Sequence, residues 1–125
     1  MKTKILYLII ALFAYMSFTD AQTPFRVRNS TECNYQCTLQ ITDGNGNYQT
    51  LGPQTCPSGG STTFYIPSGW YFSNLRVYDY LGNGWDANVS PGTTIDDVGD
   101  CEYPPQQNAD TVEYLGNNVA SIYEL

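Results

Sequence analysis

The sequence predicts an all-β fold, an antiparallel β-sandwich of about seven short strands stapled by disulfides. Three observations predict it. Apolar and polar side chains alternate in short runs, as they do in strands with one buried face. Turn-forming glycine, proline and asparagine recur every ten or so positions. All four cysteines lie in the exported part of a small chain, where disulfides are common.

The first element is a secretory signal peptide. Two lysines form a basic start, an apolar run covers residues 5–16, and small and polar residues lead to Ala21. That run is too short to span a bilayer, and no other run approaches the length of a membrane span. Cleavage after Ala21 would remove 21 of the 125 residues and leave a single domain of 104, residues 22–125. We expect a secreted protein that is extracellular or at the cell surface.

Strands follow in order, each with an alternating pattern or with many β-branched and aromatic side chains. Phe25 and Val27 alternate with two arginines, for example. The glycine-rich run from Asp43 to Asn47 is a strong hairpin signal. The expected strands cover residues 24–30, 37–42, 48–51, 62–66, 70–72, 75–80, 112–115 and 119–125.

The stretch from Asp79 to Asp86 has the composition of a cation-binding loop. Asp79, Asn83 and Asp86 offer carboxylate and amide oxygens within eight residues, and Gly82 and Gly84 let backbone carbonyls turn inward. Such oxygens hold a hard cation such as Ca²⁺. The same residues also suit a metal-free turn, because asparagine and aspartate beside glycine are ordinary turn residues.

A segment without periodicity, residues 87–110, follows this loop and is rich in acids. Compact domains rarely contain a loop of this length unless it is functional or pinned. Its acids would complete the coordination, because three side chains undershoot the six to eight oxygens that Ca²⁺ takes. The predicted Ca²⁺ ligands are Asp79, Asn83, Asp86, Asp96 and Asp97.

Residues 79–86, Asp-Tyr-Leu-Gly-Asn-Gly-Trp-Asp, resemble the Asp-x-x-Gly-Asp-Gly-Trp-Asn loop that recurs in secreted β-rich modules, many of them from Bacteroidetes. Asn83 stands where that pattern has Asp, and Asp86 where it has Asn, so the carboxylate count is unchanged. The segment Phe25-x-Val-x-Asn-x-Thr also resembles small exported Bacteroidetes β-domains of unassigned function. The resemblance implies a small secreted β-domain.

The four cysteines predict two disulfides among three possible connectivities. We expect Cys37 to pair with Cys56 across a hairpin, and Cys33 to pair with Cys101 and so tie down the acidic segment. A zinc site with four thiolates is the alternative.

The charge of the mature chain excludes several function classes. Three arginines face eleven carboxylate side chains, which gives a net charge of −8 and argues against binding to nucleic acid or anionic lipid. The absence of histidine removes the commonest general base and the usual zinc ligand. We therefore expect no enzyme. The catalytic alternative is a glycosidase couple formed by Asp79 and Asp86.

The mature chain contains nine tyrosines and two tryptophans, side chains that suit both saccharide faces and protein interfaces. We expect a non-catalytic binding or adhesion module that recognises a glycan or protein surface through its rim loops, with Trp70, Tyr80 and Trp85 in contact with the ligand. Trp85 also suits a place in the core. The alternative function is a small structural or accessory subunit of an exported or cell-surface assembly, which includes a homo-oligomer.

Overall fold

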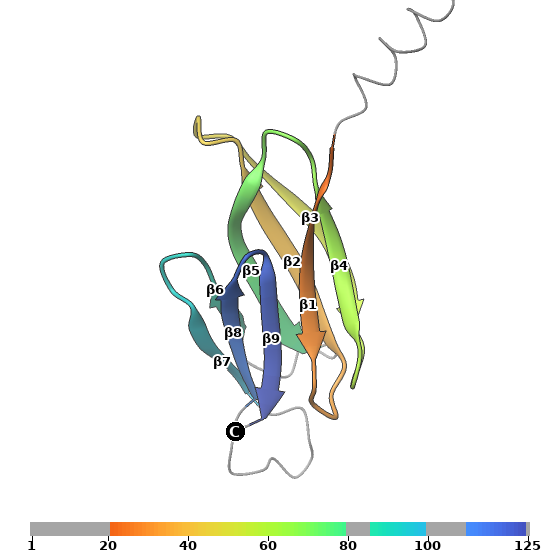
Figure 1. Ribbon diagram of the computed structural model, residues 1–125. Coiled ribbons are helices and arrows are strands. Elements are labelled where there is room, and N and C mark those ends of the chain that lie inside the picture. Colours follow the sequence, from red (N-terminus) through yellow and green to blue (C-terminus); the bar gives the residue numbers. More distant parts are fainter. Residues whose placement is uncertain (1–20, 80–85, 100–109, 125) are drawn as a thin grey trace, which may run out of the picture.

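The computed structural model describes residues 21–79, 86–99 and 110–124. These residues form two β-sheets that lie one behind the other (Figure 1), and none of them is helical. The strands are β1 (Thr23–Asn29), β2 (Tyr35–Thr42), β3 (Tyr48–Cys56), β4 (Ser61–Ile66), β5 (Tyr71–Asp79), β6 (Ala87–Val89), β7 (Ile95–Gly99), β8 (Asp110–Gly116) and β9 (Val119–Glu124).

One sheet has five strands in the order β4-β1-β9-β8-β7, and the other has four in the order β3-β2-β5-β6. All neighbours are antiparallel except β1 and β9, which run parallel. The prediction of an all-β fold is confirmed. The prediction of a purely antiparallel sandwich is wrong at this one pair, because it joins the two ends of the domain, which no local pattern connects.

Several of the predicted element boundaries are also wrong. Strand β3 runs to Cys56, although it was expected to end at Leu51. Residues 70–72 and 75–80 were expected as separate strands, but β5 is continuous and carries a bulge at Ser73, which has no partner in the register with β2. A bulge places one extra residue in a strand and so interrupts its alternation. Residues 87–110 were expected as a loop without strands, yet they contain β6 and β7. The described residues thus form nine strands instead of about seven.

The hydrophobic core fills the space between the sheets, and its residues are the alternate, inward side chains of the strands. In β2, for example, every second position is buried. Three rings from both sheets, Phe25, Phe72 and Tyr114, pack with centroids 4.5 to 5.9 Å apart. This ring cluster closes one end of the core.

Cys37 in β2 and Cys56 in β3 are buried, neighbouring free thiols. A hydrogen bond with Cys56, together with burial, raises the pKa of Cys37 well above its ordinary value of 9.0. The predicted Cys37–Cys56 disulfide is therefore not confirmed, although the two side chains are brought together. Cys33 is buried, and Cys101 lies outside the described residues, so their bridge stays a prediction.

Candidate functional site

The predicted calcium loop lies largely outside the described residues, which include Asp79 at the end of β5 and Asp86 just before β6 but not Tyr80, Asn83 or Trp85. Asp86 is engaged in an ion pair. Its carboxylate accepts hydrogen bonds from Nε and an Nη of Arg76, at 2.9 and 2.5 Å. The guanidinium of Arg76 also lies 4.7 Å from the centre of the Tyr78 ring.

The other predicted calcium ligands, Asp96 and Asp97, lie in β7, and the carboxylates of both accept hydrogen bonds from groups of the protein. Asp96 accepts hydrogen bonds from the backbone N–H of Asn88 at 2.8 Å and from that of Asp97 at 2.9 Å. Asp97 accepts one from the hydroxyl of Thr111 at 3.1 Å. Within residues 21–79, 86–99 and 110–124, no three acidic or cysteine side chains gather as a metal site. Calcium binding stays a prediction.

A different surface gathers side chains suited to a ligand, the outer face of the four-stranded sheet. We call this surface the platform. It is made by the outward residues of four strands, and their hydroxyl, amide and phenol groups dominate it. The platform consists of Tyr48, Thr50 and Thr55 of β3, Gln36, Thr38, Gln40 and Thr42 of β2, Tyr71, Asn74, Arg76 and Tyr78 of β5, and Asn88 of β6.

Two exposed tyrosines stand at one end of the platform. Thr42 pairs with Tyr48 on one side and with Tyr71 on the other, so the three residues form a row across three strands. Tyr48 is 59% exposed and Tyr71 is 63% exposed, which is unusual for large aromatic side chains. Since adjacent strands are about 4.8 Å apart, the two tyrosines are about 10 Å apart at the backbone.

Next to this row the platform is hollowed by a shallow cavity of about 280 Å³. Hydrogen-bonding side chains line it, namely Thr38, Gln40, Thr50, Asn74 and Arg76. Contacts within the sheet hold several of them in place. Asn74 donates to Asn88 at 3.1 Å, and Gln40 accepts a long hydrogen bond from Ser73 at 3.5 Å. The amide nitrogen of Gln40 and the side-chain oxygen of Asn74 have no partner among the described residues, so both can bind a ligand.

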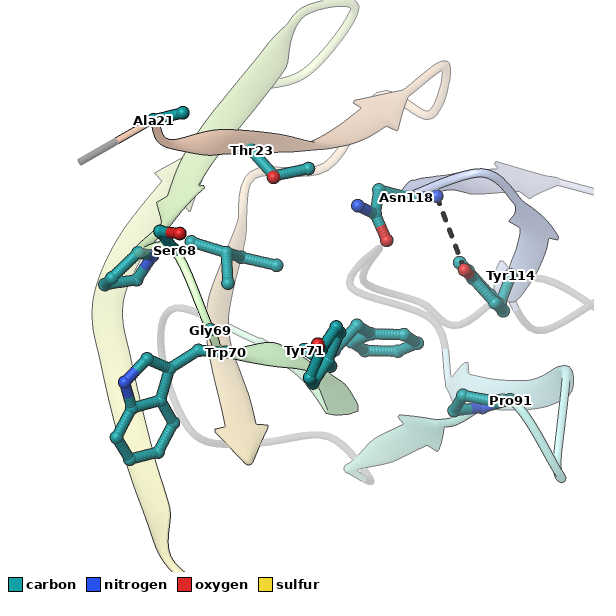
Figure 2. Close-up of a pocket in the computed structure, with 12 residues that line it drawn as sticks. Ala21, Thr23, Ser68, Gly69, Trp70, Tyr71, Pro91, Tyr114 and Asn118 are labelled. Carbon is teal, nitrogen blue, oxygen red and sulfur yellow. Dashed lines mark hydrogen bonds between the residues drawn. The ribbon is translucent and has the colours of Figure 1, made fainter. Parts of the chain in front are cut away.

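A second cavity, of about 380 Å³, opens at the end of the sandwich beyond Tyr71. Its walls come from the start of β1, the β4–β5 turn, the β6–β7 turn and the β8–β9 turn (Figure 2). The backbone N–H of Asn118 donates to the hydroxyl of Tyr114 at 3.3 Å on one side. Tyr71 belongs to this end cavity and also to the platform, so it connects the two surfaces.

Trp70 was predicted to contact a ligand, and it lines the end cavity. Its ring is directed away from Tyr71 (Figure 2) and packs partly buried against the core. Trp70 therefore supports the wall of the cavity, while the exposed Tyr71 presents its ring to solvent.

The platform was not predicted from the sequence, although β2 contains a signal for it. The four outward positions of β2 are Gln36, Thr38, Gln40 and Thr42, without a single lysine or glutamate. Solvent-facing strand positions in a chain this acidic would ordinarily include charges. Only the tertiary pairing places Tyr48 and Tyr71 beside that uncharged row.

No protein-family model, no curated protein and no solved structure matches this chain. Among the described residues, no helix is long and apolar enough to cross a membrane.

Proposed function

We propose that this chain is a secreted, non-catalytic binding module that recognises a glycan, and that the platform is its binding surface. The observation that carries the proposal is the pair of exposed tyrosines, Tyr48 and Tyr71, beside a cavity lined with hydroxyl, amide and guanidinium groups. Sugars present apolar ring faces and many hydroxyls, so an aromatic ring with adjacent amides matches both parts.

The arrangement favours a binding surface over a catalytic one. Glycosidases place two carboxylates on either side of the scissile bond, whereas the platform's cavity contains no carboxylate among its lining residues. Asp86, which lies just before β6, is already paired with Arg76. We therefore propose binding without turnover.

A glycan array followed by calorimetric titration tests the proposal. We expect the mature protein to be retained on a subset of glycans, and Tyr48→Ala or Tyr71→Ala to weaken binding about tenfold each, because a well-placed interface aromatic contributes more than about 1 kcal/mol. Tyr65→Ala is the matched control, because Tyr65 is equally exposed but lies on the five-stranded sheet.

Two outcomes would overturn this function. The first is the absence of glycan binding, or binding that survives in the Tyr48→Ala/Tyr71→Ala double variant. The second is efficient hydrolysis of a glycoside that Asp79→Asn or Asp86→Asn abolishes, which would make the protein an enzyme.

The second candidate function is a structural subunit of an exported or cell-surface assembly. The observation that favours it is that Tyr65, Ile95 and Leu115, on three strands, are all exposed on the outer side of the five-stranded sheet. Association that depends on protein concentration, in a protein that binds no glycan on the array, would support this candidate.

A further inference from the structure

The outer face of the five-stranded sheet carries charges of opposite sign on its two halves. On β1, Arg26 and Arg28 point outward while Phe25 and Val27 point into the core. Neither arginine forms an ion pair within the part of the chain that the structure describes. Both lie along a shallow cavity beside β4. This half of the face is positive, although the mature chain as a whole is strongly acidic.

The opposite half of the face is negative. Glu113 of β8 and Asp97 of β7 lie there, two and three strands from β1. The hydroxyl of Tyr123 donates to Glu113 at 3.0 Å and holds that carboxylate at the surface. This hydrogen bond, then burial, then the charges of Glu113 and Asp97 raise the pKa of Tyr123 above its ordinary value of 10.0.

The two halves are placed symmetrically about β9. Ser121 of β9 pairs with Arg28 on one side and with Glu113 on the other. Arg28 and Glu113 thus lie at the same level along the sheet, each one strand from β9, or about 4.8 Å at the backbone. Arg26 lies one step further along, beside Val119.

A face with this pattern is complementary to itself. Consider a second copy related by a two-fold axis that runs along β9 within the plane of contact. This rotation exchanges the two sides of the sheet but leaves each residue at the same position along the direction of β9. Arg28 of each copy therefore meets Glu113 of the partner subunit. Val119 meets its own counterpart near the axis, which suits an apolar contact. A two-fold interface of this kind is closed and does not grow into a fibre.

We propose that the chain forms a homodimer through the outer face of its five-stranded sheet, with Arg28 of each subunit paired to Glu113 of the other. The inference goes beyond the proposed function and does not depend on it. Among the described residues, three of the five large apolar side chains that are exposed lie on this face, Tyr65, Ile95 and Leu115. The dimer would leave both platforms exposed, on its two opposite sides.

The area of the outer face of the five-stranded sheet sets the expected affinity of the dimer. Five strands spaced about 4.8 Å apart and roughly 20 Å long present about 480 Å² in projection. Specific interfaces bury about 800 Å² of accessible surface on each partner, and those at the low end are weak. We therefore expect a dissociation constant in the micromolar range and a dimer that dissociates as salt screens its ion pairs.

Sedimentation equilibrium of the mature protein tests the dimer. We expect the mass to rise from monomer to dimer with concentration, and Arg28→Glu alone or Glu113→Arg alone to leave a monomer. The double variant R28E/E113R restores the attraction with its signs exchanged and should dimerise again. Arg76→Glu is the matched control, because Arg76 lies on the opposite sheet and its loss should leave the dimer intact. Circular dichroism confirms that each variant is folded.

A wild-type protein that stays monomeric up to several hundred micromolar would overturn the inference, as would a dimer that persists in both single variants. A monomer that binds sulfated or uronate glycans, and loses them in the Arg26→Gln/Arg28→Gln variant, would also overturn it and make the arginine pair an anion site.

Discussion

The phenol of Tyr35 in β2 donates a hydrogen bond to the carboxylate of Asp110 in β8, and this bond joins the two sheets through the core. Both side chains are almost completely buried, at 1% and 3% exposure. A buried carboxylate is costly unless hydrogen bonds compensate for its lost hydration. We infer that the pair contributes to the alignment of the two sheets.

Removal of that hydroxyl tests the alignment. We expect Tyr35→Phe to lower the free energy of unfolding by about 1–3 kcal/mol, because it takes a donor from a buried carboxylate. Tyr123→Phe is the matched control, since Tyr123 also donates to a carboxylate, that of Glu113, but at the surface. Its cost should be below about 0.5 kcal/mol. If urea denaturation showed the same loss of unfolding free energy for Tyr35→Phe and Tyr123→Phe, the buried pair would have no special role.

The neighbouring thiols of Cys37 and Cys56 should form a disulfide if the protein is exported into an oxidising compartment, as we propose. The two cysteines enclose a loop between adjacent strands, so the bridge should stabilise the fold by about 3 kcal/mol. Intact-mass measurement before and after reduction should show two hydrogens gained for this pair. In protein kept reduced, both thiols should resist alkylation until the chain unfolds, because both are fully buried. Alkylation of the folded, oxidised protein at Cys37 and Cys56 would contradict the bridge.

Acid should destabilise the turn between β2 and β3, because it protonates the carboxylate of Asp43. The side chain of Asn47 donates to this carboxylate at 2.7 Å and the backbone N–H of Asn45 at 2.8 Å, and both lower the pKa of Asp43 from its ordinary value of 3.8. A lowered pKa means that the stabilisation is present above pH 3.8 and is lost as the pH falls through the folded value.

Carbon NMR titration would follow this carboxyl directly. We expect Asn47→Ala to move the pKa of Asp43 back toward its ordinary value, because it removes the largest cause of the shift. Asn45→Ala should have little effect, since Asn45 contributes its backbone N–H. An identical titration of Asp43 in wild type and Asn47→Ala would show that the side chain of Asn47 is irrelevant.

Gly52 in β3 should not tolerate a side chain. Its φ is +93°, and a Cβ there would lie 3.0 Å from the carbonyl oxygen of Cys37 and 3.0 Å from the backbone nitrogen of Gln54. We expect Gly52→Ala to destabilise the protein by about 1–3 kcal/mol in thermal unfolding. Gly92→Ala is the control, because a Cβ at Gly92 meets no atom within 4 Å. A similar melting temperature for both variants would contradict this.

Calcium should stabilise the folded protein through the loop between β5 and β6. At 100 times its dissociation constant, a cation that binds only the folded state adds about 2.7 kcal/mol, which melting in millimolar Ca²⁺ against chelator would reveal. Asp79→Ala should abolish this rise in melting temperature. Asp43→Ala, which removes another surface acid, should retain it. If the wild type melted at the same temperature in both buffers, the loop would be a metal-free turn.

Local patterns predicted most of the strands. The alternation of Phe25 and Val27 with arginines, and the glycines between Asp43 and Asn47, placed β1 and the first hairpin correctly. Strand β7 was missed because its sequence, Ile-Asp-Asp-Val-Gly, contains too few apolar residues to alternate. Pairing with β8 supplies the backbone hydrogen bonds that make it a strand.

By itself the sequence determined the all-β class, the alternation of inward and outward residues in strands such as β1, and the first hairpin turn, because these depend on residues that are neighbours along the chain. Only the tertiary structure decided the parallel pairing of β1 with β9, and with it the alignment of Arg28, Ser121 and Glu113. It likewise placed Tyr48 and Tyr71 on either side of Thr42. The physical reason is that a surface is assembled across strands, and the register between distant strands depends on how both sheets fill their shared core.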